Sequence, residues 1–309
     1  MLGDKIKLYR ENKKMTQNEV AALLDVSSAT ISKYESGSLE PSIESIKKLA
    51  ELFEISIDEL LSDEEKIDIS KINVLDILRE QKEMKLKGNL YHRTQVSFAY
   101  NTNHIEGSTL TEDQTRYIFE TNTILFEGDT VAKVDDILET ANHFKLVDYM
   151  LDVADKKLTE KMIKEFHKIL KDGTSDSRVE WFNVGEYKQK TNTIGSGIKT
   201  AAPKNVEKEM SKLMDWYNSL KQVTAKEIIE FHYRFETIHP FQDGNGRIGR
   251  IIMFKECLKN NIIPFIIQDA DKLFYYRGLK EYKSEKGYLT DTCLNAQDQY
   301  IKMIEYYLK

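Results

Sequence analysis

The stretch HPFQDGNGRIGR, from His239 to Arg250, decides how the rest of the chain is interpreted. Before it, the apolar residues of AKEIIEFHYRFETI, residues 225–238, recur along one face of a predicted helix. After it, the apolar run IIMFKECLKN predicts a second, largely buried helix that ends where Asn260 and Pro264 interrupt the pattern. The sequence therefore predicts two helices joined by a short loop, with the second helix starting inside the quoted stretch.

The loop and the first turn of the second helix have the residues expected of an anion-binding site. Gly244 and Gly246, with Asn245 between them, tolerate a positive φ and let backbone amides face a ligand. The unpaired N–H groups and the positive dipole end of the helix point to the same place. Arg247 and Arg250 share a face of the first turn, where two cations are unfavourable unless an anion is bound. The pattern predicts a polyphosphate site.

Two further residues of the stretch supply chemistry for that site. Asp243 offers an anionic oxygen, and a phosphate-bound Mg²⁺ needs only one or two protein carboxylates. His239 has an imidazole that could take a proton from an attacking hydroxyl. Together these parts suit phosphoryl or nucleotidyl transfer. The alternative is a plain turn, in which the histidine and the following proline end a helix, the glycines bend the chain and the arginines are solvated.

The stretch resembles the Fic family motif, His-Pro-Phe-x-Asp/Glu-Gly-Asn-Gly-Arg-x-x-Arg, at every specified position. The resemblance implies transfer of AMP from ATP to a hydroxyl group of a protein, with His239 as the general base and Asp243 as the Mg²⁺ ligand. The contacts that it implies with the α- and β-phosphates of ATP are Gly244, Asn245, Gly246 and Arg247, and the γ-phosphate contact is Arg250. Doc relatives, which transfer phosphate instead, have Ala and Lys in place of Gly244 and Arg247, so the Doc branch is disfavoured.

Composition predicts a helical protein of two domains. The chain has 309 residues, 40% hydrophobic and 31% charged, and its frequent Lys, Glu, Leu and Ile favour helices. A net charge of -6 excludes chain-wide attraction to nucleic acid or an anionic membrane. Cys257 and Cys293 lack a CxxC spacing and predict reduced core thiols. Because no apolar leader and no run approaching the ~18 apolar residues of a spanning helix is present, we expect a cytoplasmic protein without a membrane partner.

Residues 1–63 predict five short helices, the second opened by a capping box between Thr16 and Glu19. The string TQNEVAALLDVSSATISKYESGSLEPSIESIKKLAELFEISIDELL resembles the lambda-repressor-like (XRE) helix-turn-helix family along its whole length. The resemblance implies a recognition helix over residues 28–35. The candidate DNA contacts are Gln17, Ser28, Thr30 and Lys33. The alternative is a module that only contacts proteins, because this segment has more acidic than basic residues.

The remaining chain is predicted to consist of a connecting helix or linker and one larger domain. Residues 62–71, SDEEKIDISK, are polar and charged, as is typical of a domain boundary. We assign the linker to residues 64–88 and the Fic-like domain to 89–309, with its core at about 158–285. The expected fold class is all-α: a five-helix lambda-repressor-like domain followed by a helical Fic domain with one small β-hairpin flap.

The helix predicted over residues 89–106 ends at Gly107 and has Glu106 at the negative end of its dipole. A carboxylate is unfavourable there unless a cation lies opposite, and Arg250 is the expected cation. The sequence from Thr102 to Gly107 resembles the Fic inhibitory motif, Ser/Thr-x-x-x-Glu-Gly/Asn. The resemblance implies that Glu106 pairs with Arg250, occupies the γ-phosphate position and blocks productive binding of ATP. The alternative is an exposed glutamate at the end of a helix.

Residues 185–200, GEYKQKTNTIGSGIKT, are the one stretch predicted as strand, with the turn of a hairpin at GSG. They resemble the Fic flap, which holds a target segment by backbone pairing as an added strand. The predicted docking edge is Thr193, Ile194 and Gly195. Further along the chain, Tyr275 and Tyr276 resemble the adenine-side tyrosine pair of the family.

These features predict a protein adenylyltransferase that uses ATP and Mg²⁺, is autoinhibited by Glu106 and carries a DNA-binding or regulatory domain. The expected partners are DNA and a target protein with a Ser, Thr or Tyr hydroxyl, a class that includes the chain itself. A homo-oligomer is compatible with the sequence. Two alternatives stay open: a transcription regulator whose Fic domain only senses nucleotide, and an enzyme that removes AMP with Glu106 orienting water.

Overall fold

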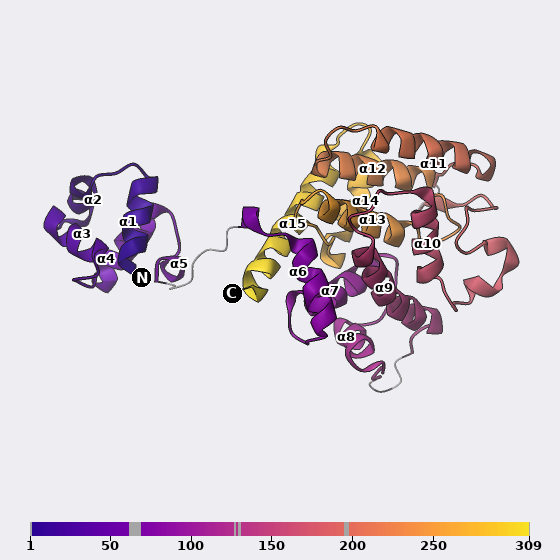
Figure 1. Cartoon of the computed structure of the whole chain (residues 1–309), viewed down its shortest axis with the longest axis horizontal. Helices are drawn as coiled ribbons and strands as arrows, with labels where there is room; N and C mark the ends of the chain where they lie inside the picture. The colour runs from indigo at the N-terminus through magenta and orange to yellow at the C-terminus, as the bar shows by residue number, and fades with distance from the viewer. Residues whose placement is uncertain (1, 62–68, 127, 129–130, 195–197, 309) are drawn as a thin grey trace. The chain divides into compact units, whose positions relative to one another are not determined.

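The structure, a computed structural model, describes residues 2–61, 69–126, 128, 131–194 and 198–308 (Figure 1). Contacts between residues divide the chain into two compact units, Met1–Ile67 and Asp68–Leu308. Both units are helical, and the described residues contain one pair of two-residue strands, so the expected all-α class with a small hairpin is confirmed. Within the described part of the chain, none of the helices combines the length and apolar character needed to cross a bilayer.

The first unit has the five short helices that the sequence predicts. They are α1 (Leu2–Asn12), α2 (Gln17–Leu24), α3 (Ser28–Glu35), α4 (Ile43–Phe53) and α5 (Ile57–Leu61). The predicted capping box is present, because the side chains of Thr16 and Glu19 each accept a hydrogen bond from the other residue's backbone N–H. The buried core of this unit includes Ile6, Val20, Ile31, Leu49 and Leu60. Helices too short to be stable alone are therefore held by one shared apolar core.

The second unit is built around one buried helix. Its helices are α6 (Val74–Met84), α7 (Leu90–Ile105), α8 (Glu112–Thr121), α9 (Val134–Asp152), α10 (Glu160–Leu170), α11 (Pro203–Asn218), α12 (Ala225–Ile238), α13 (Asn245–Lys259), α14 (Lys272–Glu281) and α15 (Gly287–Tyr307). Every residue of α13 from Asn245 to Leu258 is buried, and the helix contacts α6, α7, α9, α10 and α12. Its apolar residues are spread around the helix, as burial on all sides requires, and Arg247, Arg250, Lys255 and Glu256 are buried among them. The motif that begins α13 is therefore placed in the interior of the unit.

Helix α6 belongs to the core of the second unit. Val74, Leu75 and Leu78 are buried in the same apolar cluster as residues of α9, α12 and α13. The segment expected as a connecting helix thus packs into the larger unit, and its N-cap Asn73 accepts hydrogen bonds from two backbone N–H groups.

The predicted hairpin is present as strands β1 (Thr193–Ile194) and β2 (Ile198–Lys199), which pair antiparallel with Thr193 opposite Lys199. Gly195, expected at the docking edge, lies outside the described residues. Short 3-10 helices complete the unit: η1 (Ile69–Lys71), η2 (Asp176–Arg178), η3 (Glu180–Phe182) and η4 (Asp269–Asp271).

Candidate active site

The loop between α12 and α13 is fixed by its own side chains. Helix α12 ends at His239, which has a φ of 53°, a left-handed conformation that non-glycine residues rarely adopt. Asn245 accepts a hydrogen bond from the backbone N–H of Phe241 at 2.8 Å and donates one to its carbonyl oxygen at 2.9 Å. The ring of Phe241 stacks on His167 of α10, with 4.0 Å between ring centroids. The loop is therefore anchored at both its backbone and its aromatic residue.

Two glycines of α13 allow close approach of acidic side chains. A Cβ at Gly246 would collide with the carboxylate of Glu106, and one at Gly249 would lie 2.7 Å from Glu236 and from His232. Gly244, the N-cap of α13, has a φ of 77°. Gly246 and Gly249 therefore leave room at the start of α13 for side chains from the end of α7 and from α12.

Arg250 is held by the end of α7, as the sequence led us to expect. Its Nη2 lies 2.6 Å from Oε1 of Glu106 and 3.1 Å from the carbonyl oxygen of Thr102, and its Nε donates to Thr102 Oγ1 at 2.6 Å. The side chain of Arg250 is 2% exposed and that of Glu106 is 29% exposed. Glu106 caps α7 and is followed by Gly107 with a φ of 97°, the predicted helix end. An internal carboxylate thus neutralises this arginine.

His239 faces a carboxylate that the sequence did not point to. Its Nδ1 lies 3.7 Å from Oε2 of Glu236, one helical turn earlier on α12, and both side chains are largely buried. Burial alone would raise the pKa of Glu236, but His239, His232 and Arg250 outweigh it and hold the pKa below its usual value. Glu236 is therefore an anion. Its spacing of three residues before His239 was the signal in the sequence.

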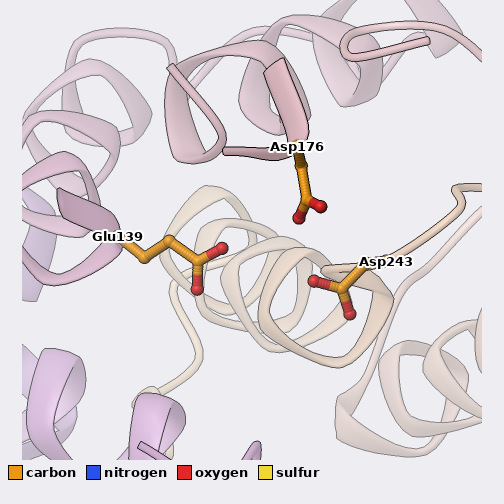
Figure 2. Close-up of side chains that lie close together, drawn as sticks. All are labelled: Glu139, Asp176 and Asp243. Carbon is orange, nitrogen blue, oxygen red and sulfur yellow. The ribbon is translucent and has the colours of Figure 1, made fainter. Parts of the chain in front are cut away.

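Asp243 belongs to a cluster of carboxylates that Figure 2 shows converging from separate segments. Oxygen atoms of Glu139, Asp176 and Asp243 all lie within 4.8 Å of one another. The ammonium of Lys171 lies among them, and Arg247 donates hydrogen bonds to Glu139 and to Asp243. The sequence pointed to Asp243 and Arg247 but not to the other three residues.

The two tyrosines expected beside adenine differ in their surroundings. Tyr275 is 1% exposed, and its hydroxyl lies 2.7 Å from Nε2 of His232 and 3.3 Å from Nη1 of Arg250. Tyr276 is 36% exposed, and its hydroxyl donates to the carbonyl oxygen of Ile105. Tyr275 therefore supports the arginine from behind, whereas Tyr276 offers ring surface beside the end of α7.

The hairpin is tied to the motif loop by Lys188. The backbone N–H of Lys188 donates to the carbonyl oxygen of Pro240 at 2.8 Å. Its ammonium lies 2.7 Å from Oδ1 of Asn192 and 2.7 Å from Oγ1 of Thr200, which flank the hairpin. Asn192 donates to the carbonyl oxygen of Phe241. Burial lowers the pKa of Lys188 to about 8. The flanks of β1 and β2 are thus connected to the loop that carries the histidine.

The four candidate DNA contacts of the first unit are not equally available. Gln17 donates to Glu35, which also pairs with Arg10, and the hydroxyl of Thr30 bonds to that of Ser27 within the cap of α3. The structure gives the side chains of Ser28 and Lys33 no hydrogen bond within the described part of the chain, and Lys33 is exposed.

Two parts of the chain match known protein families. Residues 157–257 match the Fic/DOC family, and residues 6–60 match a helix-turn-helix family. A curated "Protein adenylyltransferase Fic" of Nematostella vectensis is 31% identical over 186 residues, which are 59% of this chain and 42% of the relative. The relative of the same description from Drosophila willistoni is 30% identical over 59% of this chain and 35% of its own length. The chain spans less than half the length of these relatives.

Solved structures show the same fold. A Fic-domain-containing signaling protein from Bacteroides thetaiotaomicron is 26% identical and superposes with a TM-score of 0.56 over 76% of this chain and 90% of its own. Fic-1 from C. elegans superposes with a TM-score of 0.57 over 94% of this chain and 98% of its own at 16% identity, a likeness of fold alone.

Proposed function

Because the chain carries a Fic/DOC domain after a helix-turn-helix domain, we propose that it is a protein adenylyltransferase that transfers AMP from ATP to a hydroxyl group of a protein. The single observation that carries this proposal is the convergence of His239, Asp243 and Arg250 at the buried N-terminus of α13. A helix N-terminus with arginines in its first and second turns is suited to a polyphosphate, and an imidazole at its edge is suited to activate the acceptor hydroxyl.

In the proposed reaction His239 accepts the proton of a Ser, Thr or Tyr hydroxyl, and the hydroxyl oxygen attacks the α-phosphorus of ATP. The bond from that phosphorus to the bridging oxygen breaks, and pyrophosphate leaves toward Arg247 and Arg250. Glu236, near Nδ1 of His239, favours the tautomer that leaves Nε2 free to accept the proton. The proposed contact for the adenine ring is Tyr276. The proposed contact for the backbone of the target protein is β1.

Asp243 has the properties of a ligand for a divalent cation. Burial would raise its pKa, but Arg247 and Lys171 outweigh burial and hold the pKa well below the usual range, so the side chain is an anion. The side chain is 53% exposed, which leaves oxygen surface for an incoming ion. We propose that Asp243 holds Mg²⁺ brought in with ATP, and that the ion neutralises charge on the phosphates.

Glu106 is the proposed brake on this activity. Its carboxylate takes the guanidinium of Arg250, and it lies where the absence of a side chain at Gly246 leaves space above α13. A γ-phosphate that needs Arg250 must displace this carboxylate. We therefore expect low activity in the wild-type chain and higher activity when the carboxylate is removed.

Incubation with ATP labelled at the α-phosphate tests the proposal. We expect Glu106→Gly protein, or its target in a lysate, to become labelled more strongly than the wild type does, because Arg250 is released. Adding His239→Ala should abolish the labelling. Glu54→Gly is a matched control, because Glu54 is also the C-cap of its helix but lies in the other unit. Equal labelling of all four proteins would refute the proposal. An AMP-modified target that only the wild type releases would instead assign AMP removal.

A second proposal concerns the first unit, whose match to a helix-turn-helix family favours DNA binding. We propose that α3 contacts DNA, with Ser28 and Lys33 available and with Gln17 and Thr30 needing to leave their present partners. Gel-shift of the promoter region of its own gene, with and without ATP, tests this. Normal DNA binding by His239→Ala protein, together with no detectable AMP transfer by Glu106→Gly protein, would favour a regulator that only senses nucleotide.

The buried free thiols of Cys257 and Cys293 support a reducing compartment, and we propose the cytoplasm.

A further inference from the structure

Three carboxylates meet beside the N-terminus of α13, and they come from Glu139 on α9, Asp176 in η2 and Asp243 in the motif loop (Figure 2). We call them the acidic cluster. We propose that the ammonium of Lys171 is the resident cation of the acidic cluster and excludes divalent cations from it while no nucleotide is bound. This role makes Lys171 a positioning residue for Asp243.

The geometry of Lys171 matches that of a bound ion. Its Nζ lies 2.5 Å from Glu139 Oε1, 2.7 Å from Asp176 Oδ2 and 2.6 Å from Asp243 Oδ2. An ammonium has three N–H donors, so each donor can serve a different carboxylate. Ca²⁺ binds carboxylate oxygens at about 2.3–2.6 Å, so this cluster of oxygens has nearly the size of a divalent cation site. The lysine occupies the centre of that site.

Burial and charge explain why the lysine stays there. The side chain of Lys171 is 1% exposed, and a buried ammonium is costly unless it is paired and hydrogen-bonded. The carboxylates of Glu139, Asp176 and Asp243 supply that pairing, each within 2.7 Å of the ammonium nitrogen. Lys171 and Arg247 are the two basic side chains that contact these carboxylates in the described residues. A divalent ion would have to displace an ammonium that contacts all three carboxylates of the acidic cluster.

One consequence concerns how Asp243 meets its metal. Oδ2 of Asp243 is shared by Lys171 and Arg247, while the side chain remains half-exposed. Only part of the carboxylate is left for an ion, so we expect an ion to bind well only with nucleotide phosphates as additional ligands. This coupling to nucleotide rests on the proposed function, but the exclusion of metal from the nucleotide-free protein does not.

Mn²⁺ binding by the full chain without nucleotide tests the proposal. The electron paramagnetic resonance signal of free Mn²⁺ reports how much ion is bound. We expect no Mn²⁺ site in the wild type or in Lys168→Met, a matched change of an exposed lysine in the last turn of α10, the helix that Lys171 caps. Folded Lys171→Met should gain one Mn²⁺ site, because affinity rises with the number of free carboxylates. The additional change Asp176→Asn should remove the gained site.

Two results would overturn the proposal. One is a Mn²⁺ site in the nucleotide-free wild type that Asp176→Asn removes, because the ion would then share or take the place of the lysine. The other is folded Lys171→Met protein, with a native circular dichroism spectrum, that gains no site. Neither result depends on AMP transfer, so failure here is distinguishable from failure of the proposed function.

A measurement on the wild type keeps the proposal testable if Lys171→Met does not fold. Acetylation of accessible lysines, mapped by mass spectrometry, should modify Lys168 and leave Lys171 unmodified, both with and without MnCl₂. Modification of Lys171 that appears only when MnCl₂ is added would show that the metal ion displaces the ammonium, and would refute the proposal.

Discussion

Removing the carboxylate of Glu106 should tighten ATP binding, because ATP and Glu106 compete for Arg250. The pair is short, at 2.6 Å, and Arg250 is 2% exposed, so the hydrogen bond is charge-assisted and poorly screened. Hydrogen bonds to charged groups contribute roughly 1.5–3 kcal/mol, and the lower half of that range applies because Glu106 is 29% exposed. A contribution of about 2 kcal/mol corresponds to about 30-fold in Kd.

Titration calorimetry measures this change directly. The ligand is an ATP analogue that cannot be cleaved between the α- and β-phosphates, supplied with Mg²⁺ so that binding is seen without turnover. We expect Glu106→Ala to bind it about 30-fold more tightly than the wild type. Glu54→Ala, a change at the corresponding helix end in the other unit, should bind like the wild type. Equal affinity of Glu106→Ala and wild type would refute the proposed competition for Arg250.

Three further predictions follow from other contacts. In the Glu106→Gly background, Glu236→Gln should lower kcat for AMP transfer by about 10- to 100-fold, with little change in KM for ATP, because the substitution removes the charge that faces His239. An unchanged kcat in steady-state assays would exclude a positioning role for Glu236. Folding lowers the pKa of Lys188 from 10.5 to about 8. Below pH 8 the charged ammonium destabilises the folded state by the full amount, and this destabilisation declines as the pH rises toward 10.5. Urea unfolding should therefore show stability rising with pH over that window in the wild type, relative to Lys188→Met, and parallel profiles would contradict this. Lys33→Ala should weaken DNA binding, measured by fluorescence anisotropy, and should reduce by about one unit the slope of log binding constant against log salt concentration. An unchanged slope would show that Lys33 does not contact a phosphate.

Local features of the fold were predictable because they depend on neighbouring residues. The capping box at Thr16, the helix end at Gly107 and the pairing of β1 with β2 are all present. The contact between Glu106 and Arg250 joins residues far apart in the chain, and it was expected because two motifs resemble those of one family.

Other features depend on packing that no short pattern encodes. The acidic cluster and Lys171 are brought together by α9, α10, η2 and the motif loop. The spacing of these four residues along the chain matches no metal-binding motif and gives no sign that a lysine lies among the carboxylates.

Intact-mass spectrometry of Glu106→Gly protein after incubation with ATP, Mg²⁺ and a lysate of target proteins tests most directly whether this site transfers AMP. We expect AMP to appear on the chain or on a lysate protein, and to be absent when His239→Ala is added. AMP on neither the chain nor any lysate protein, or equal modification with and without His239, would contradict the proposed activity.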